Sequence, residues 1–353
     1  MKKTVFNHTV GALSLLTLSL GLLSCEPQKC TGCPEEGLPA TLTLTLSQSA
    51  TKSTVAPADA EDNRINTIDV FIFNAPEEGT PGYGQLDTYG RFEENLEQIE
   101  IQTTTGPKKI CVIVNAKAGM TDGVTSLGQL RAVVAGLKDE TFGNLTMYGE
   151  TDSDLDINSS VSVSVSRFIS RIAITSIKTR FAGTPYEGST LSNCRIYLIN
   201  AHADTRLDGQ ASQSPAILNK GALSATDMEG LSQEALMLDD LTSTVNDAGY
   251  TAAHYLYCYP NETDDPDNCT MAVLQADLNG STYYYPIPVN QEGYGYIEDN
   301  GHYGIRGNTV YSYSITVTRP GSTDPDAPID TQALAVTVNV EDWDVIPEFN
   351  KIF

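Results

Sequence analysis

The cysteine at position 25 is the residue whose surroundings point most directly to covalent chemistry. Residues 22–25 read Leu-Leu-Ser-Cys, and they follow Lys2, Lys3 and an apolar run over Val10–Leu23. That run has the length of a signal peptide and is too short to cross a bilayer comfortably. The pattern is that of a lipobox, in which the thiol is acylated, for example with palmitate, and becomes the mature N-terminus. Residues 1–24 are therefore predicted to be a signal peptide and Cys25 the lipid attachment site. An ordinary signal peptide with an incidental cysteine is the alternative.

Two basic residues point to a second reaction, cleavage of the chain by a trypsin-like protease. Lys52 lies in a polar loop over residues 50–63, and Arg64 follows that loop directly. No other Lys or Arg occurs between Lys29 and Arg91. Exposed loops of small polar residues are preferred sites of proteolysis. We expect a cut after Lys52, or alternatively after Arg64.

The segment that such a cut would release is a strand with strict two-residue alternation, Ala40–Ser49. Leu42, Leu44 and Leu46 fall on one face, and threonines fall on the other. Burial at roughly 1.5–3 kcal/mol per leucine amounts to ~5–9 kcal/mol, comparable with the ~5–15 kcal/mol net stability of a domain. The prediction is a removable first strand whose loss leaves a groove that needs a replacement.

The rest of the chain is predicted to be mainly β. The full sequence is 40% hydrophobic and 19% charged, and it is rich in Tyr, Thr, Ser and Val, which favour strands. Glu77–Gly90 is predicted to be a turn region, and Asn279 with Gly280 a type I′ hairpin. Strands are expected over Ile65–Asn74, Glu97–Thr104, Lys109–Ala116, Ser160–Ser166, Cys194–Asn200, Ala253–Tyr259, Met271–Leu278, Ser281–Val289, Thr309–Val317 and Leu334–Val340.

One run has helical spacing. Thr125 or Ser126 caps it, and Gln129 completes a capping box with Ser126. The apolar positions of this predicted short helix are Leu127, Leu130, Val133, Val134 and Leu137.

Charge and length exclude some classes of protein. The 45 Asp and Glu residues outnumber 21 Lys and Arg, and the resulting net charge of −24 repels phosphate backbones. We therefore expect no nucleic-acid partner. The 353 residues suffice for two domains, and the apolar run Arg167–Lys178 places the predicted boundary near residue 165.

The other reactive side chains do not form a recognisable catalytic or metal site. His202, His254 and His302 lie in unlike contexts, and no nucleophile elbow or phosphate-binding glycine loop is present in the sequence. Asp152, Asp154 and Asp156 are spaced as in a calcium loop, but the central glycine and the bidentate glutamate of an EF-hand are missing. No catalysis, metal or cofactor is expected.

The cysteines after Cys25 belong to a chain predicted to be exported, and the oxidising environment of exported proteins permits disulfides. Cys258 and Cys269 flank a loop that a disulfide could close, whereas Cys111 and Cys194 sit in apolar runs and are expected to be buried thiols.

The C-terminal end is unusually apolar for a soluble monomer. Four residues of its last strand share one face, and five further apolar residues follow Trp343. In order, these candidate donor residues are Leu334, Val336, Val338, Val340, Val345, Ile346, Phe349, Ile352 and Phe353.

Taken in order, these features resemble the fimbrillin family, the type V pilins of Bacteroidales in their FimA and Mfa forms. The resemblance is carried by the lipobox, the alternating first strand, the basic cut site and four later segments. Those segments are Asp69–Asn74, Val112–Ala116 before a short helix, Ser170–Ala173, and Val336–Trp343 with its apolar tail.

The resemblance implies two β-sandwich domains of transthyretin-like Greek-key topology with one or two short helices. Residues 25–52 would be a tether and removable strand, 53–165 the N-terminal domain, and 166–353 the C-terminal domain with the donor strand. It also implies export to the outer membrane as a lipoprotein, cleavage by a trypsin-like enzyme, and donor-strand exchange among fimbrial subunits at the cell surface. An Arg-specific cut is the family pattern, and here the aligned cation is Lys52.

A second hypothesis is a monomeric surface lipoprotein, or a fimbrial anchor or tip, that binds glycans on a host or bacterial receptor. Its basis is a group of tyrosines that could stack against sugars, although aromatics filling a sandwich explain them too. They are Tyr283, Tyr284, Tyr285, Tyr294, Tyr296, Tyr303, Tyr311 and Tyr313.

Overall fold

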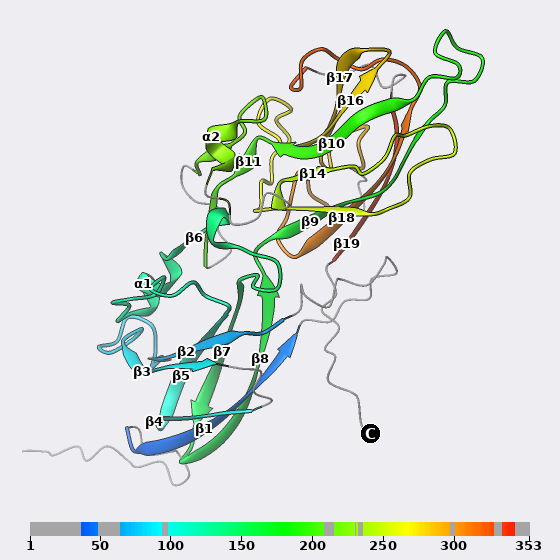
Figure 1. Cartoon of the computed structure of the whole chain (residues 1–353). Helices are drawn as coiled ribbons and strands as arrows, with labels where there is room; N and C mark the ends of the chain where they lie inside the picture. Colours follow the sequence, from blue (N-terminus) through cyan, green and yellow to red (C-terminus); the bar gives the residue numbers. More distant parts are fainter. Residues whose placement is uncertain are drawn as a thin grey trace, which may run out of the picture. The chain divides into compact units, whose positions relative to one another are not determined.

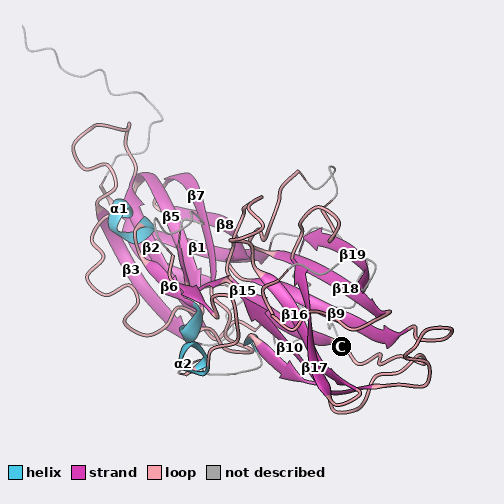
Figure 2. Cartoon of the chain, turned by 90° about the horizontal axis from the view of Figure 1, so that it is seen from above, coloured by secondary structure: helices cyan, strands magenta, loops and turns pink. Residues whose placement is uncertain are grey.

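The computed structural model describes residues 37–48, 64–93, 98–207, 215–229, 231, 236–296, 301–327 and 334–342. Strands dominate them, and the two α-helices, α1 (Leu127–Arg131) and α2 (Ala225–Met228), are short (Figure 2). The predicted mainly β fold is confirmed. No helix of the described residues is long and apolar enough to cross a membrane.

The first large sheet uses seven strands in the order β3-β2-β5-β7-β8-β1-β4 (Figure 1). All seven lie within the first 167 residues: β1 (Pro39–Gln48), β2 (Thr67–Asn74), β3 (Leu86–Glu93), β4 (Ile99–Thr104), β5 (Gly106–Val114), β7 (Met147–Leu155) and β8 (Asn158–Arg167).

Two four-stranded sheets follow, in the orders β14-β10-β16-β17 and β15-β9-β18-β19, and together the sheets form a sandwich-like arrangement. Their strands are β9 (Ser170–Thr179), β10 (Leu191–Ile199), β14 (Leu238–Asp240), β15 (His254–Cys258), β16 (Met271–Leu278), β17 (Ser281–Pro288), β18 (Thr309–Val317) and β19 (Leu334–Asp342). Two small ladders pair β11 (Ala201–His202) with β13 (Ile217–Leu218), and β12 (Asp204–Arg206) with β6 (Val134–Gly136).

The hairpin predicted at Asn279 and Gly280 is present. Both residues have positive φ, 53° and 84°, as a type I′ turn requires, and Leu278 pairs with Ser281 across it. The turn region predicted over Glu77–Gly90 ends earlier than expected, because its last residues begin β3 and pair with β2.

The predicted helix is shorter than its apolar spacing indicated. Ser126 caps α1 by accepting a hydrogen bond from the Gln129 backbone N–H, while the Gln129 side chain accepts one from the backbone N–H of Thr125. The prediction that Val134 and Leu137 continue the helix is wrong. Val134 belongs to β6, which pairs with β12, and Leu137 starts a short 3-10 turn, Leu137–Asp139. β-branched residues such as Val134 lose side-chain freedom in a helix. Because β12 is available for pairing, Val134 adopts a strand conformation instead.

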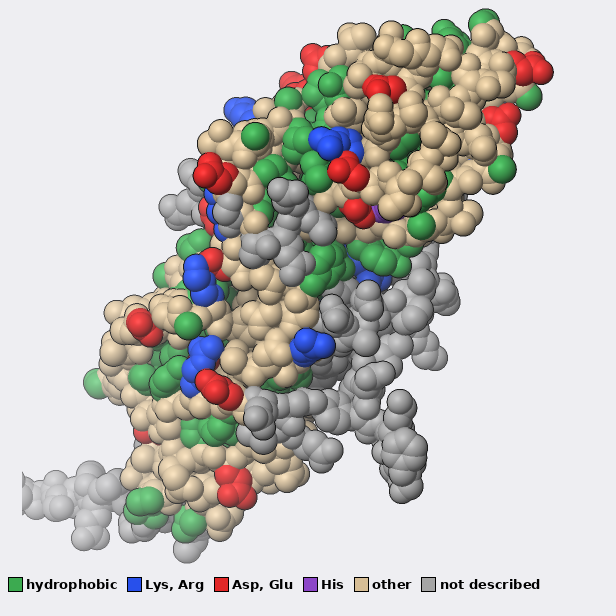
Figure 3. Space-filling view, viewed as in Figure 1, with side chains coloured by type: hydrophobic (Ala, Val, Ile, Leu, Met, Phe, Trp, Pro, Cys, Tyr) green, Lys and Arg blue, Asp and Glu red, His purple; other side chains and the backbone are tan. Residues whose placement is uncertain are grey.

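The core of the first sheet is a cluster of aliphatic side chains to which nearly every strand of that sheet contributes. Its buried members are Leu42, Leu44, Ile68, Val70, Ile72, Ile99, Ile101, Ile110, Val112, Val114, Met147, Leu155, Val163 and Val165. The first strand is thus part of this core and not an appendage to it. On the outside, acidic side chains are spread over the visible face without forming one patch (Figure 3).

Candidate functional site: the first-strand groove

The candidate site is the groove that β1 fills between β8 and β4, called here the first-strand groove. β1 runs parallel to β8 from Thr41 opposite Asn158 onward, and antiparallel to β4 from Pro39 opposite Thr104 onward. Because both long edges of β1 are paired, removing it would leave two strand edges without partners.

The apolar face of β1 is buried as the alternation predicts. Leu42 and Leu44 are fully buried in the core cluster, and Leu46 packs against it while half-buried. Two buried leucines contribute roughly 3–6 kcal/mol. On the opposite face, Thr41 accepts a hydrogen bond from the Gln102 side chain at 3.1 Å in an exposed setting. The side-chain contacts that stabilise β1 are therefore made mainly by its leucine face.

The start of β1 is tied to the turn between β4 and β5. The backbone N–H of Thr105 donates to the carbonyl of Leu38 at 2.8 Å, and the N–H of Leu38 donates back to the Thr105 hydroxyl at 3.0 Å. Gly37, with φ +80°, also donates to the Thr105 carbonyl. These contacts fix the register in which the leucines enter the groove.

A buried ion pair holds β4 to strands other than β1. The Asp87 carboxylate on β3 lies 3.2 Å from the ammonium of Lys108 on β5, whose side chain is 2% exposed. Asp87 also accepts hydrogen bonds from Thr103 and Thr104 of β4, at 2.6 and 3.0 Å. Burial opposes ionisation of Asp87, but the hydrogen bond from Thr103 and the charge of Lys108 lower its pKa below the usual value.

This arrangement matters because β4 ends the strand order and, among the described strands, its backbone is paired only with β1. The contacts of Asp87 connect β4 to β3, the strand at the other end of that order. With them, β4 has an anchor that does not depend on β1. Sequence reasoning missed Asp87 and Lys108; the one signal was a pair of lysines directly before the apolar run of β5.

Of the two candidate cleavage sites, Lys52 and Arg64, only Arg64 lies within the described residues. Lys52 lies outside the described residues, as does Cys25. Arg64 is exposed, but its carbonyl accepts a hydrogen bond from the Asn115 side chain at 2.8 Å. Asn115 is buried with φ +59°, and it also accepts from the backbone N–H of Asn66 at 2.8 Å. The backbone next to Arg64 is therefore held in place.

The candidate donor residues fall into two groups. Leu334–Val340 lie in β19, which pairs antiparallel with β18 along nine residue pairs, from Val317 opposite Leu334 to Thr309 opposite Asp342. Val336 packs against the neighbouring core while half-buried. The tail residues Val345, Ile346, Phe349, Ile352 and Phe353 lie outside the described residues.

The disulfide considered for Cys258 and Cys269 is not formed. Both are free, buried thiols, as are Cys111 and Cys194, which the sequence predicted to be so. The physical reason is that Cys258 and Cys269 pack into different hydrophobic clusters. Burial raises the pKa of the Cys269 thiol to about 11 and that of Cys111 to about 12, so these groups are poor nucleophiles.

The aspartates with calcium-like spacing do not lie in one loop. Asp152 and Asp154 belong to β7, and Asp152 pairs with Lys109 at 2.7 Å. Within the described parts of the chain, no three His, Cys, Asp or Glu side chains gather closely enough to hold a metal ion.

The eight tyrosines do not form a single surface. Tyr285, Tyr311 and Tyr313 are fully buried in the hydrophobic core. Of the others, Tyr296 and Tyr303 stack against each other with ring centroids 3.8 Å apart. These three buried tyrosines therefore fill the interior of the sandwich, as the alternative interpretation of the tyrosine group predicted.

Comparisons with known proteins agree with this architecture. Residues 40–161 match the family model for the major fimbrial subunit protein (FimA). The chain is 24% identical over 332 residues to a protein assigned as the fimbrium tip subunit Fim1C of Parabacteroides distasonis, covering 84% of this chain and 83% of the relative.

Two solved structures share the fold. One, from Parabacteroides distasonis and assigned to cell adhesion, gives a TM-score of 0.65 at 20% identity and covers 89% of this chain and 99% of its own. The other, a fimbrilin (FimA) of Porphyromonas gingivalis, gives 0.62 at 16% identity, with 88% and 99% covered.

The sheets and the two solved structures agree in a β-sandwich fold, and the family match over residues 40–161 is to a fimbrial subunit. The family model and the curated relatives support a FimA/Mfa-like fimbrillin of Bacteroidales, in agreement with the resemblance seen in the sequence.

Proposed function

We propose that this protein is a structural subunit of a cell-surface fimbrium that serves adhesion, and that it polymerises by exchanging its first strand for a segment of a neighbouring subunit. The relatives named as fimbrial subunits and adhesion proteins support the fimbrial role and its surface location. The observation that carries the exchange is the position of β1, whose two edges and one leucine face are all in use.

The proposed maturation begins with export as a lipoprotein acylated at Cys25. A trypsin-like protease then cuts after Lys52, which frees β1 from the rest of the chain. We favour Lys52 over Arg64 because a protease needs an extended, accessible peptide, and the carbonyl of Arg64 is bound by Asn115.

The shape and chemistry of the resulting groove determine which segment can occupy it. It presents unpaired backbone groups on β8 and β4 and an apolar floor, so its occupant must be an extended segment with alternating or apolar side chains. The contacts of Asp87 keep β4 in place while the groove is empty.

The donor we propose is the C-terminal tail, through Val345, Ile346, Phe349, Ile352 and Phe353. Use of Leu334–Val340 instead would require separating β19 from β18 across nine residue pairs. Those residues are therefore the second choice, and they serve to connect the tail to its own subunit.

A matched pair of variants tests the maturation step. Lys52→Gln should remain uncleaved and monomeric, whereas Arg64→Gln should be processed and polymerise as the unaltered chain does, as judged by gel filtration and electron microscopy. Deleting Val345–Phe353 should leave a folded monomer without polymer. If the Lys52→Gln chain or the deletion variant forms polymer, the proposal is contradicted.

A further inference from the structure

A cavity of about 700 Å³ lies in the C-terminal half of the chain, remote in sequence from β1. Its walls come from the loop between β15 and β16, from the paired strands β16 and β17, and from the segments after β17 and β18. Small-molecule sites in proteins typically occupy ~300–1,000 Å³. We call it the Tyr303 cleft, after the tyrosine that lines it.

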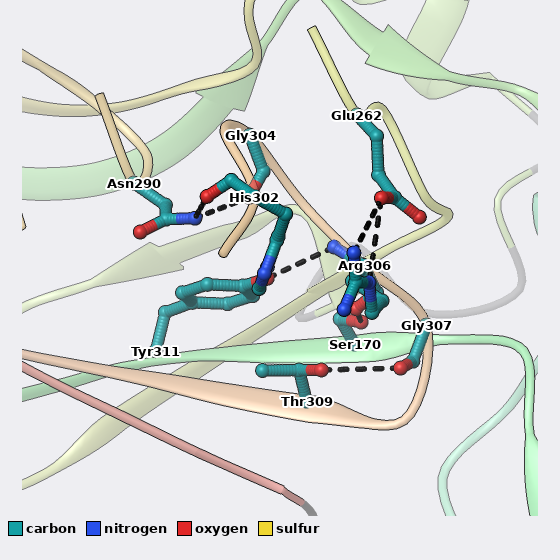
Figure 4. Close-up of polar contacts among 9 residues, drawn as sticks. All are labelled: Ser170, Glu262, Asn290, His302, Gly304, Arg306, Gly307, Thr309 and Tyr311. Atoms are coloured by element: carbon teal, nitrogen blue, oxygen red, sulfur yellow. Dashed lines mark hydrogen bonds and ion pairs between the residues drawn. The ribbon is translucent and has the colours of Figure 1, made fainter. Parts of the chain in front are cut away.

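Buried side chains hold Tyr303 in place. Asn290, which is fully buried, donates hydrogen bonds to the carbonyls of His302 at 2.9 Å and Gly304 at 3.0 Å, on both sides of Tyr303 (Figure 4). The ring of His302 is hydrogen-bonded to the Tyr311 hydroxyl at 2.9 Å. The same hydroxyl accepts from the backbone N–H of Arg306, also at 2.9 Å. The segment that carries Tyr303 is thus fixed at both ends.

The ring of Tyr303 is itself preorganised. It stacks on Tyr296 with an interplanar angle of 7° and ring centroids 3.8 Å apart. A second tyrosine, Tyr294, lines the cleft together with Pro286 and Pro288. Flat aromatic and proline surfaces suit the apolar C–H faces of pyranose rings.

The opposing acidic loop is fastened to the tyrosine segment. Asn261 and Ile305 exchange two backbone hydrogen bonds, at 2.8 and 3.0 Å, and the Gln291 side chain donates to the Thr263 carbonyl at 2.7 Å. Gly304 permits this approach, since a Cβ there would lie 2.2 Å from the Asn261 carbonyl oxygen. The two walls therefore form one rigid frame.

The charged groups that line the cleft are the carboxylates Asp264, Asp267, Glu292 and Asp326. Asp326 accepts a hydrogen bond from the Asn200 side chain at 3.2 Å, whereas Asp264, Asp267 and Glu292 have no side-chain partner among the described residues. No described Lys, Arg or His lines the cleft. Such a surface repels phosphate, sulfate and carboxylate groups but accepts hydrogen bonds from hydroxyls. The carboxylates are not gathered tightly enough to hold a metal ion.

We propose that the Tyr303 cleft binds a neutral saccharide, with sugar hydroxyls donating to Asp264, Asp267 and Glu292 and a pyranose face lying on Tyr303. This inference deepens the adhesive part of the proposed function, because it names the class of ligand. It does not depend on strand exchange.

The test uses the Lys52→Gln chain in the fraction that elutes as a monomer in gel filtration, so that saccharide binding is measured separately from polymerisation. The probes are neutral tetrasaccharides of glucose, galactose, mannose or N-acetylglucosamine, a sialylated tetrasaccharide and tetralysine, each titrated by calorimetry. At least one neutral probe should bind, with an affinity that changes little with sodium chloride, and the sialylated probe should not.

Variants separate a specific site from loose contact. Tyr303→Ala should weaken binding about tenfold or more, and Tyr303→Phe should retain it. Tyr83→Ala, at a half-buried tyrosine outside the cleft, is the matched control and should have no effect. The paired exposed change Asp264→Asn with Glu292→Gln should also weaken binding without unfolding the chain. Absence of binding by every neutral probe overturns the proposal, and so does salt-sensitive binding of tetralysine alone.

Discussion

Leu42 in β1 lies directly opposite Ile101 in β4, and both side chains are buried in the same aliphatic cluster. The pair joins the strand proposed to leave to a strand that must remain. The stabilisation from this contact is present only in the uncleaved precursor. After cleavage, the incoming segment must make an equivalent apolar contact with Ile101.

Replacement of Leu44 by alanine should destabilise the uncleaved chain by about 2–5 kcal/mol, because it leaves a cavity in a fully buried position. Thr43→Ala, on the outer face of the same strand, should cost much less. Urea denaturation of the precursors measures both. In polymer built from cleaved subunits, Leu44→Ala should have no effect on stability, and an equal loss there would contradict the removal of β1.

Asp87→Asn should destabilise the chain by roughly 3–5 kcal/mol, because it leaves the buried ammonium of Lys108 without its counter-charge. Asp152→Asn is the control, since Asp152 is 71% exposed in its pair with Lys109 and such pairs contribute ~0–1 kcal/mol.

The Asp87 effect has a defined pH dependence. The pKa of Asp87 is lower in the folded than in the unfolded chain, so its stabilisation is present at neutral pH and is lost as the pH falls through the lowered value. The stability difference between the unaltered chain and Asp87→Asn should therefore shrink in acid. A difference that stays constant down to strongly acidic pH would argue against the ion pair.

Glu140 should make the chain more stable in mild acid. It is 1% exposed and accepts hydrogen bonds from the Thr146 backbone N–H and the Tyr259 hydroxyl, each at 2.8 Å. Burial raises its pKa from 4.5 to about 6 despite those bonds. The folded state thus holds the proton more tightly, and its contribution is complete below pH 4.5 and is lost as the pH rises through about 6.

The size of the Glu140 effect follows from the same shift. A difference of about 1.5 pKa units corresponds to about 2 kcal/mol between mild acid and neutral pH. Glu140→Gln should remove this slope, whereas Glu229→Gln, at an exposed glutamate, should keep it. Denaturation midpoints of both variants across pH 4 to 8 provide the check, and an unchanged slope in Glu140→Gln would assign the effect elsewhere.

Strong periodicity made much of the fold predictable. The alternation at Leu42, Leu44 and Leu46 identified β1, and the Asn279-Gly280 pair identified the hairpin that joins β16 and β17. Both signals are local, since each depends only on which residues are adjacent in the chain. The helix over α1 was predicted too long, because the pairing of Val134 with Arg206 depends on a strand some 70 residues away.

The sites beyond β1 depended on contacts that spacing does not reveal. Asp87 and Lys108 come from different strands, and only the folded sheet brings them within 3.2 Å. The tyrosines that looked like one group have different environments, since Tyr285, Tyr311 and Tyr313 are buried in strands whereas Tyr294 and Tyr303 line a cleft from a segment between strands. Cys258 and Cys269 are close in sequence but pack into separate clusters.

We expect β1 to be absent from the assembled fibre and the tail of a neighbouring subunit to occupy its place. The most direct test is mass-spectrometric determination of the N-terminus of subunits in fimbriae purified from cells. We predict that the chains begin at Ser53, directly after the cleaved Lys52, and contain no peptide from Pro39–Gln48. Fibre subunits that still carry Leu42 and Leu44 in an uncut chain would contradict the account.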